Sequence, residues 1–237
     1  MGEVNKMGTI VKMDDVWKRY RMGKAGDLTV LKEINLGIKK GEFVAITGPS
    51  GSGKSTMMHL VGALDVPSYG NVYLDDKNIG KISESSLAML RSKKIGFIFQ
   101  QFNLIPTLNA LQNVMLPMEL IDIPEGIAKE RAESLLGMLG LKERMHHKPS
   151  ELSGGQQQRV AIARSLANNP EIILADEPTG NLDSRTGTFV MDFLGEMHEK
   201  YGKTIILVTH DLNLVHYAKR VIHIKDGRIE KEVKNGR

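Results

Sequence analysis

A glycine-rich segment, residues 48–56, holds the side chains best suited to binding phosphate. Its sequence matches G-x-x-x-x-G-K-[ST] after an apolar run and before a helical pattern, which is the context of a phosphate-binding loop. The glycines let backbone N–H groups approach phosphate oxygens, Lys54 supplies a cation, and Ser55 offers a hydroxyl to Mg²⁺. The residues expected to surround the phosphates are Gly48, Pro49, Ser50, Gly51, Ser52, Gly53, Lys54, Ser55 and Thr56. The loop by itself does not distinguish between kinases, GTPases, helicases and transport ATPases.

Two adjacent carboxylates follow a second apolar run. The stretch EIILADE is typical of a buried strand that ends at Asp176 and Glu177. Ligands of parallel sheets lie beyond the carboxyl ends of the strands, so we expect Asp176 to help bind Mg²⁺. Glu177 is then placed to orient or deprotonate the attacking water. Without the glycine-rich loop, the two acids would suit a cap before Pro178 equally well.

A third motif, LSGGQ, opens a helix rather than following a strand. Ser153 is a favourable N-cap, and Gly154 and Gly155 expose backbone N–H groups at the helix start. Gln156 completes the motif before the stretch QQRVAIARSLANNP, whose apolar positions recur with helical spacing. The segment predicts a second helix end that binds an anion, although an ordinary capped helix would also have this sequence.

These motifs need a sheet whose strands end at one edge. Apolar runs predict strands at residues 10–16, 34–38, 43–47, 71–74, 95–99, 172–175 and 204–208. A helix is expected over residues 54–64, and helical stretches are expected between and after the last two strands. Residues 101–167 are mainly helical in pattern. Strands that alternate with helices favour a largely parallel sheet covered on both faces.

Composition narrows the class of protein. The 237 residues carry a net charge of +4, with 41% hydrophobic and 25% charged residues, which suits one globular α/β domain over 1–237. The chain has no cysteine, which excludes disulfides and thiolate chemistry and fits a reducing compartment. No apolar run approaches the ~18 residues of a spanning helix. We therefore expect any membrane role to come through a partner.

In their order along the chain, with LSGGQ between the phosphate loop and the acidic pair, the three motifs resemble those of the ABC ATPases, and the resemblance extends from about Thr9 to the end of the sequence. It implies an α/β fold with a P-loop NTPase core, residues 9–100 and 168–237, whose sheet is mainly parallel. An N-terminal antiparallel β subdomain and an inserted α-helical subdomain, residues 101–167, complete the expected architecture. The resemblance also implies ATP and Mg²⁺ as cofactors, and hydrolysis of ATP to ADP and phosphate.

Two further positions match the pattern of this family early in the chain. Tyr20 resembles the aromatic residue that stacks on adenine, and Trp17 is a nearby alternative. Gln100 resembles the glutamine that senses Mg²⁺ and water, with Gln101 as the adjacent alternative. The apolar loop that follows, residues 102–108, is expected to dock onto a transmembrane partner.

Two more positions match near the end of the sequence. Asp183 lies in the segment NLD, which resembles the loop that crosses a dimer interface. His210, after the run ILVT, resembles the histidine that contacts the γ-phosphate. The expected catalytic residues are Lys54, Gln100, Glu177 and His210, and the expected metal ligands are Ser55, Gln100 and Asp176.

The family arrangement implies a second copy of the chain as the first partner. In a head-to-tail dimer, the phosphate loop of one copy and residues 153–156 of the other enclose each ATP. An integral membrane permease is the second expected partner, which places the chain in the cytoplasm on the inner face of the membrane. The long motif stretches are most similar to the lipoprotein-release and macrolide-export type ATPases. QQFNLIPTLNALQNVM is also similar to importers of polar amino acids.

Two other classes of protein remain open at this point. A soluble ABC ATPase of DNA repair or translation would share these motifs, but such proteins usually carry two cassettes, a coiled-coil arm or cysteine-rich inserts. A small-molecule kinase would share the phosphate loop without needing the LSGGQ helix. No nucleic-acid partner is expected.

Overall fold

Two structural units divide the chain, with boundaries after Ala88 and after Met197. The computed structural model describes residues 8–21, 23 and 26–235. The first unit combines the segment up to Ala88 with the segment from His198, and the second is Met89–Met197. None of the helices in the described residues is both long and apolar enough to cross a bilayer. The division of the sequence into a core and an inserted subdomain at residues 101–167 stays a prediction.

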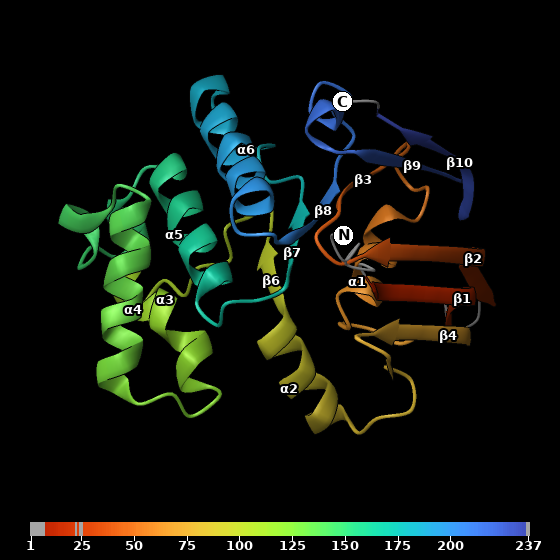
Figure 1. Cartoon of the computed structure of the whole chain (residues 1–237), viewed down its shortest axis with the longest axis horizontal. Coiled ribbons are helices and arrows are strands. Elements are labelled where there is room, and N and C mark those ends of the chain that lie inside the picture. The colour runs from red at the N-terminus through yellow and green to blue at the C-terminus, as the bar shows by residue number, and fades with distance from the viewer. Residues whose placement is uncertain (1–7, 22, 24–25, 236–237) are drawn as a thin grey trace, which may run out of the picture. The chain divides into compact units, whose positions relative to one another are not determined.

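An antiparallel sheet forms part of the first unit, in the strand order β2-β1-β4-β5 (Figure 1). Its strands are β1 (Thr9–Arg21), β2 (Asp27–Lys39), β4 (Tyr69–Leu74) and β5 (Lys77–Asn78). β1 and β2 are longer than predicted, because the turn-like composition of the segment between them hides strand residues such as the fully buried Leu31. The expected N-terminal antiparallel subdomain is therefore present.

The first unit also contains a sheet around β3 (Phe43–Thr47), in the order β10-β9-β3-β8. β8 (Thr204–Val208) and β9 (Arg220–Lys225) are parallel to β3, and β10 (Arg228–Lys234) is antiparallel to β9. Every residue of β3 and β8 is buried, which explains their uninterrupted apolar sequences.

Two predictions about helices in this unit were wrong in detail. Helix α1 (Lys54–Val61) stops before the predicted residue 64, at the C-cap Gly62. After β8 the chain forms only a short 3₁₀ turn, η4 (Val215–Tyr217), and then the β9–β10 hairpin instead of a helix. Asp226 and Gly227 both have positive φ at the hairpin turn, so this Asp-Gly pair was the sequence signal for the missed hairpin.

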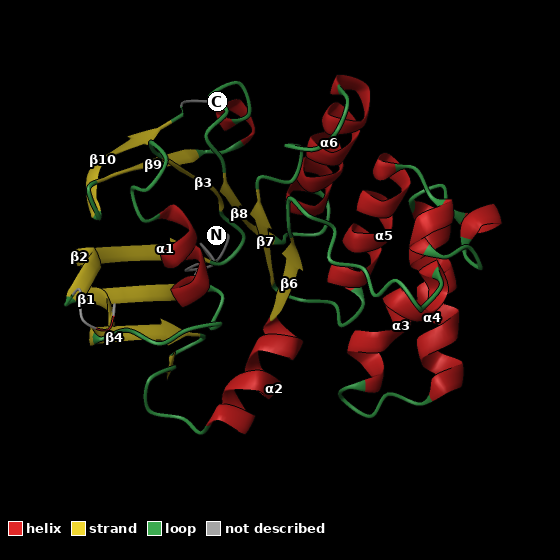
Figure 2. Ribbon diagram, turned by 180° about the vertical axis from the view of Figure 1, so that it is seen from behind, coloured by secondary structure: helices red, strands yellow, loops and turns green. Residues whose placement is uncertain are grey.

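The second unit pairs two parallel strands with a group of helices. β6 (Ile95–Ile98) lies beside β7 (Ile172–Asp176), and helices α3, α4 and α5 pack together (Figure 2). The helices of this group are α3 (Ala110–Glu119), α4 (Glu125–Met138) and α5 (Gly154–Leu166), with short 3₁₀ turns η2 (Lys142–Arg144) and η3 (Pro149–Glu151). Helix α2 (Glu84–Lys94), which was not predicted, leads into β6, and α6 (Ser184–Glu199) follows β7.

Close packing of β6 against α5 depends on one glycine. A Cβ atom added to Gly96 would lie 2.2 Å from the carbonyl oxygen of Ser165. The apolar positions that recur with helical spacing in α5, Val160, Ile162, Ala163 and Leu166, are buried. The α/β fold with parallel strands, an antiparallel sheet and a helical group is thus the one predicted.

Candidate nucleotide-binding site

The phosphate-binding loop connects the buried strand β3 to helix α1, as its pattern requires. Gly48 has φ 153°, and a Cβ atom there would lie 2.1 Å from the carbonyl oxygen of Ile224. Gly53 has φ 105°, and a Cβ atom there would lie 2.8 Å from a methyl carbon of Leu31. Both positions therefore need glycine. The buried hydroxyl of Ser52, within this loop, has no hydrogen-bond partner in the described part of the chain.

Lys54 is folded back over the loop. Its ammonium group donates to the carbonyl oxygens of Gly48 and Pro49, both at 2.9 Å. The first turn of α1 adds backbone N–H groups that have no partner within the helix, and Ser55 is exposed beside them. A cation and free donors at one loop mouth form a binding site for an anion such as a phosphate group.

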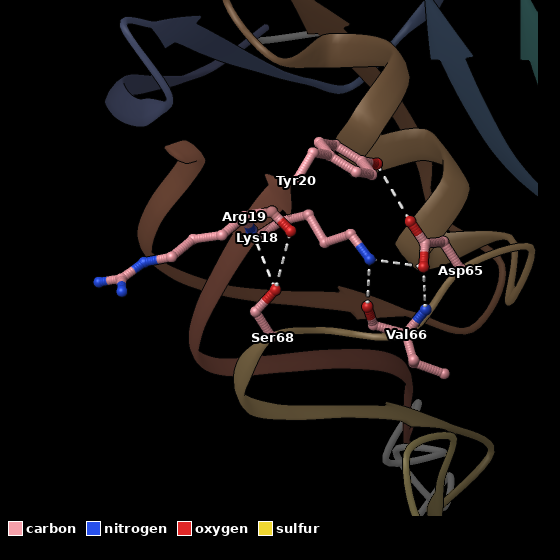
Figure 3. Close-up of polar contacts among 6 residues, drawn as sticks. All are labelled: Lys18, Arg19, Tyr20, Asp65, Val66 and Ser68. Carbon is pink, nitrogen blue, oxygen red and sulfur yellow. Dashed lines mark hydrogen bonds and ion pairs between the residues drawn. The ribbon is translucent and has the colours of Figure 1, made fainter. Parts of the chain in front are cut away.

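Of the two aromatic candidates on β1, only Tyr20 is tied to helix α1. The hydroxyl group of Tyr20 donates to Asp65 at 3.0 Å (Figure 3). It also interacts with the hydroxyl of Thr56. Burial and the neighbouring Asp65 carboxylate raise the pKa of Tyr20, so it remains a donor. The indole N–H of Trp17 instead donates to Asp15 at 3.2 Å. Of the two candidates, Tyr20 is therefore the one whose side chain contacts the helix that follows the phosphate loop.

His210 leaves the sheet beside the phosphate loop. In the parallel pair β3–β8, Val208 lies opposite Ile46, and the amide of Thr209 donates to the carbonyl oxygen of Ile46 at 3.1 Å. His210 follows directly and is exposed. Because parallel strands end at the same edge, His210 and Gly48 emerge as neighbours there.

The acidic pair and Gln100 emerge together in the second unit. In the parallel pair β6–β7, Ile98 lies opposite Ala175, so Gln100 and Glu177 each follow two residues later at the same edge. Asp176 and Glu177 are partly buried. Glu177 has φ 44°, a left-handed conformation that costs a residue other than glycine about 1–3 kcal/mol and is concentrated at functional sites.

The segment after Glu177 is held against Gln100. The side-chain amide of Asn181 donates to the carbonyl oxygen of Gln100 at 3.0 Å, and a Cβ atom on Gly180 would lie 2.7 Å from the side-chain nitrogen of Gln100. Buried Gln158, on helix α5, donates to the carbonyl oxygen of Pro178 at 2.7 Å. Helix α5 therefore fixes the chain immediately after the acidic pair.

The LSGGQ segment forms the capped helix start that the sequence predicted. The Ser153 hydroxyl accepts from the Gln156 amide at 3.3 Å, and the Gln156 side chain accepts from the Ser153 amide at 2.9 Å. Gly155 packs against Thr186, whose hydroxyl donates to Asp183 at 2.7 Å. Hydrogen bonds from Thr186 lower the pKa of Asp183, so it stays ionised. Thr186 thus joins the LSGGQ segment to Asp183.

The predicted site residues fall into two groups. The first unit carries Tyr20, residues 48–56 and His210, and the second carries Gln100, residues 153–156, Asp176, Glu177 and Asp183. Gln158 and Thr186, which hold the second group in place, were not predicted from the sequence. The sequence does carry a local signal for Thr186. It lies three residues after Asp183, which is the spacing between a helix N-cap and its N3 partner. In the described part of the chain, no cluster of three or more His, Asp or Glu side chains forms a ready metal site.

Comparison with known proteins gives matches over almost the whole chain. Residues 31–180 match the family model described as ABC transporter. The chain is 52% identical to the uncharacterized ABC transporter ATP-binding protein MJ0796 of Methanocaldococcus jannaschii, over 95% of this chain and 97% of that protein. It is 51% identical to the macrolide export ATP-binding/permease protein MacB of Bdellovibrio bacteriovorus, over 94% of this chain but 34% of MacB.

A solved structure is similar over the same extent. The dimeric, post-hydrolysis structure of the ATP-binding cassette MJ0796 bound to ADP and Pi is 50% identical to this chain, with a TM-score of 0.89. The match covers 96% of this chain and 100% of that chain.

Proposed function

The chain belongs to the ABC transporter family, and on that premise we propose that it is the ATP-hydrolysing subunit that drives a transmembrane permease from the cytoplasmic face of a membrane. The observation that carries the proposal is the phosphate loop between β3 and α1, with Lys54 at its mouth. The similarity to macrolide export ATP-binding/permease proteins supports transport over DNA repair, translation or import of polar amino acids. It also supports the macrolide-export branch of the family.

ATP is bound mainly through its phosphates. Lys54 exchanges its carbonyl partners for phosphate oxygens, and residues 48–56 contribute backbone N–H groups. The hydroxyl of Ser55, the carboxylate of Asp176 and the side chain of Gln100 are the proposed Mg²⁺ ligands, since oxygen atoms are what Mg²⁺ prefers. Once bound, Mg²⁺ neutralises negative charge on the phosphates.

Hydrolysis needs a positioned water molecule and a base. Glu177 follows the proposed metal ligand Asp176 and is the proposed general base. Its left-handed backbone fixes the direction in which the side chain leaves the strand. His210 contacts the γ-phosphate, because it emerges beside the strand that leads into the phosphate loop.

A second copy of the chain completes each ATP site. The helix start at Ser153, with Gly154 and Gly155, is an exposed set of donors of the kind that bind phosphate. In a head-to-tail dimer it faces the ATP held by the phosphate loop of the partner copy, and Asp183 lies at the same interface. The MJ0796 cassette bound to ADP and Pi is dimeric, which supports this arrangement.

The permease is proposed to dock in a cleft of the second unit. The cleft is lined largely by apolar residues in or directly after β6 and α3, among them Phe97, Phe99, Leu116 and Leu120, together with Arg164 of α5. The loop 102–108, which the sequence suggested for docking, contributes only Asn103 to this cleft. Arg164 donates to the carbonyl oxygens of Phe102 and Asn103 at 2.9 and 2.6 Å, so the loop is fixed beside the cleft.

The phosphate-loop assignment is tested with Lys54→Ala. Removal of the cation should abolish measurable ATPase activity or tight ATP binding, because no other side chain of the loop carries a positive charge. Lys77→Ala, at an exposed position of β5, is the matched control and should keep the parent activity. ATPase activity in Lys54→Ala equal to that of the control would disprove the assignment.

A further inference from the structure

A lysine is buried in the antiparallel sheet of the first unit. The side chain of Lys18 is 10% exposed, and its ammonium group donates to the Asp65 carboxylate at 2.6 Å and to the Val66 carbonyl oxygen at 2.9 Å (Figure 3). A cation removed from water in this way needs a counterion and hydrogen-bond acceptors. Asp65 provides the charge and Val66 provides the second acceptor.

The Asp65 carboxylate accepts hydrogen bonds from three donors. Besides Lys18, the Val66 amide donates to it at 2.7 Å and the Tyr20 hydroxyl at 3.0 Å. Burial alone would raise the pKa of Asp65, but the hydrogen bonds from Lys18, Val66 and Tyr20 outweigh it and lower the pKa. Asp65 is therefore a fixed carboxylate that holds the hydroxyl end of Tyr20.

The Tyr20 side chain is held at its hydroxyl end and on one face of its ring. Its hydroxyl group lies between Asp65, which follows the C-terminal end of helix α1, and Thr56, in the first turn of the same helix. The ammonium group of Lys18 lies over the ring, 4.9 Å from its centroid. One face of the ring is thus covered by a cation, and its position is set relative to the helix that follows the phosphate loop.

We propose that Lys18 and Asp65 are positioning residues for the nucleotide base: they hold the Tyr20 ring at a fixed place from the phosphate loop, so that the base stacks on a platform already in position. The inference rests on the proposed function, in which Tyr20 stacks on the base of ATP. A ring that is already ordered loses less conformational entropy when the ligand binds. The Lys18–Asp65 pair therefore contributes to the affinity for the base and not to that for the phosphates.

The backbone of β1 has a separate anchor at this point. The Arg19 amide donates to the Ser68 hydroxyl at 2.9 Å, and that hydroxyl donates to the Arg19 carbonyl oxygen at 3.3 Å (Figure 3). Loss of the Lys18–Asp65 pair therefore leaves the strand attached to the segment before β4. Removing the Lys18–Asp65 pair should therefore affect the position of the Tyr20 ring without removing this anchor of the sheet.

The experiment compares the Kd for ATP with that for ribose 5′-triphosphate, which has the same sugar and phosphates but no base. The variants are Tyr20→Phe, which keeps the ring without its hydroxyl group, and the double variant Lys18→Met with Asp65→Ala, which leaves no buried charge unpaired. Each should weaken ATP binding about three- to tenfold, the value of one net hydrogen bond, and change ribose triphosphate binding less than about twofold. Combining the three substitutions should add little, because all act through one ring.

Tyr73→Phe is the matched control, since Lys12 lies over the Tyr73 ring at 5.7 Å in the same sheet. It should leave both affinities unchanged. If the double variant weakens both ligands alike, or neither, while Tyr20→Ala selectively weakens ATP, the positioning role is wrong and the Tyr20 platform stands. If Tyr20→Ala leaves the ratio of the two affinities unchanged, Tyr20 is not the platform, and the positioning role is wrong with it.

Discussion

At the residue scale, the role proposed for Glu177 in hydrolysis depends on the conformation that this residue adopts directly after β7. The residue combines a carboxylate, partial burial and a left-handed backbone, next to a second carboxylate at Asp176. The fold maintains this costly conformation by holding the following segment, through Gln158 on Pro178 and Asn181 on Gln100. Strain retained in this way is expected where the direction of one side chain matters for chemistry.

Glu177→Gln should bind ATP and dimerise but fail to turn over. Glutamine keeps the shape of glutamate but cannot accept the proton from water, and general-base assistance is typically worth ~10²–10⁴ in rate. It also removes a negative charge next to the triphosphate, so the affinity for ATP should rise. Phosphate release and size-exclusion chromatography with ATP measure both effects. A variant that hydrolyses ATP at the parent rate, or stays monomeric with ATP, would remove Glu177 from this role.

Single residues were predictable where their type and local spacing carry the chemistry. The phosphate loop, the acidic pair and the LSGGQ cap could all be located because each is a continuous segment at the end of a strand or the start of a helix. The Lys18–Asp65 pair spans 47 positions in sequence and has no local signal. The choice between Tyr20 and Trp17 also needed the contact with Thr56, which only the folded chain provides.

At the element scale, the continuous apolar strands were predicted well, whereas helix α2 and the β9–β10 hairpin were not predicted. β3 and β8 are continuous apolar runs, and their observed bounds are those predicted. Helix α2 was missed because its sequence, ESSLAMLRSKK, is mainly polar. The β9–β10 hairpin was missed because the Asp-Gly turn at residues 226–227 was not recognised.

The cleft formed by β6, α3 and α5 allows a test of docking that leaves the ATP site intact. Leu120 lines the cleft and is 71% exposed, so Leu120→Glu should not disturb the core. A charge there should prevent an apolar segment of a permease from binding, while the ATPase activity of the purified chain stays unchanged. The fraction of protein in the membrane pellet of the cells should fall.

Ile127→Glu, on helix α4, is the control for Leu120→Glu. Ile127 is 59% exposed and belongs to the same unit, but it does not line the cleft. Equal membrane association of both variants and the parent would place the docking surface elsewhere. Loss of basal ATPase activity in Leu120→Glu would show that the residue has a structural role instead.

At the scale of the whole molecule, the proposed ATP sites require two copies of the chain. Each copy carries one phosphate loop and one LSGGQ helix start, and each ATP site is proposed to use the loop of one copy and the helix start of the other. In the proposed dimer the γ-phosphate would join the two halves, so ATP would favour the closed dimer and hydrolysis would remove that preference. The proposed cycle of closing and opening would then drive the permease.

Mixing two inactive variants tests this sharing of sites most directly. Lys54→Ala destroys the phosphate loop, and Gly154→Asp places a negative charge at the LSGGQ helix start, where an added Cβ meets only the Phe102 ring at 3.7 Å. A mixed dimer holds one intact site, formed by the loop of the second variant and the helix start of the first. The equimolar mixture should recover up to about a quarter of parent ATPase activity, because half of the dimers are mixed and each mixed dimer has one of its two sites intact. No recovery, with mixed dimers demonstrated by cross-linking, would contradict this sharing of sites.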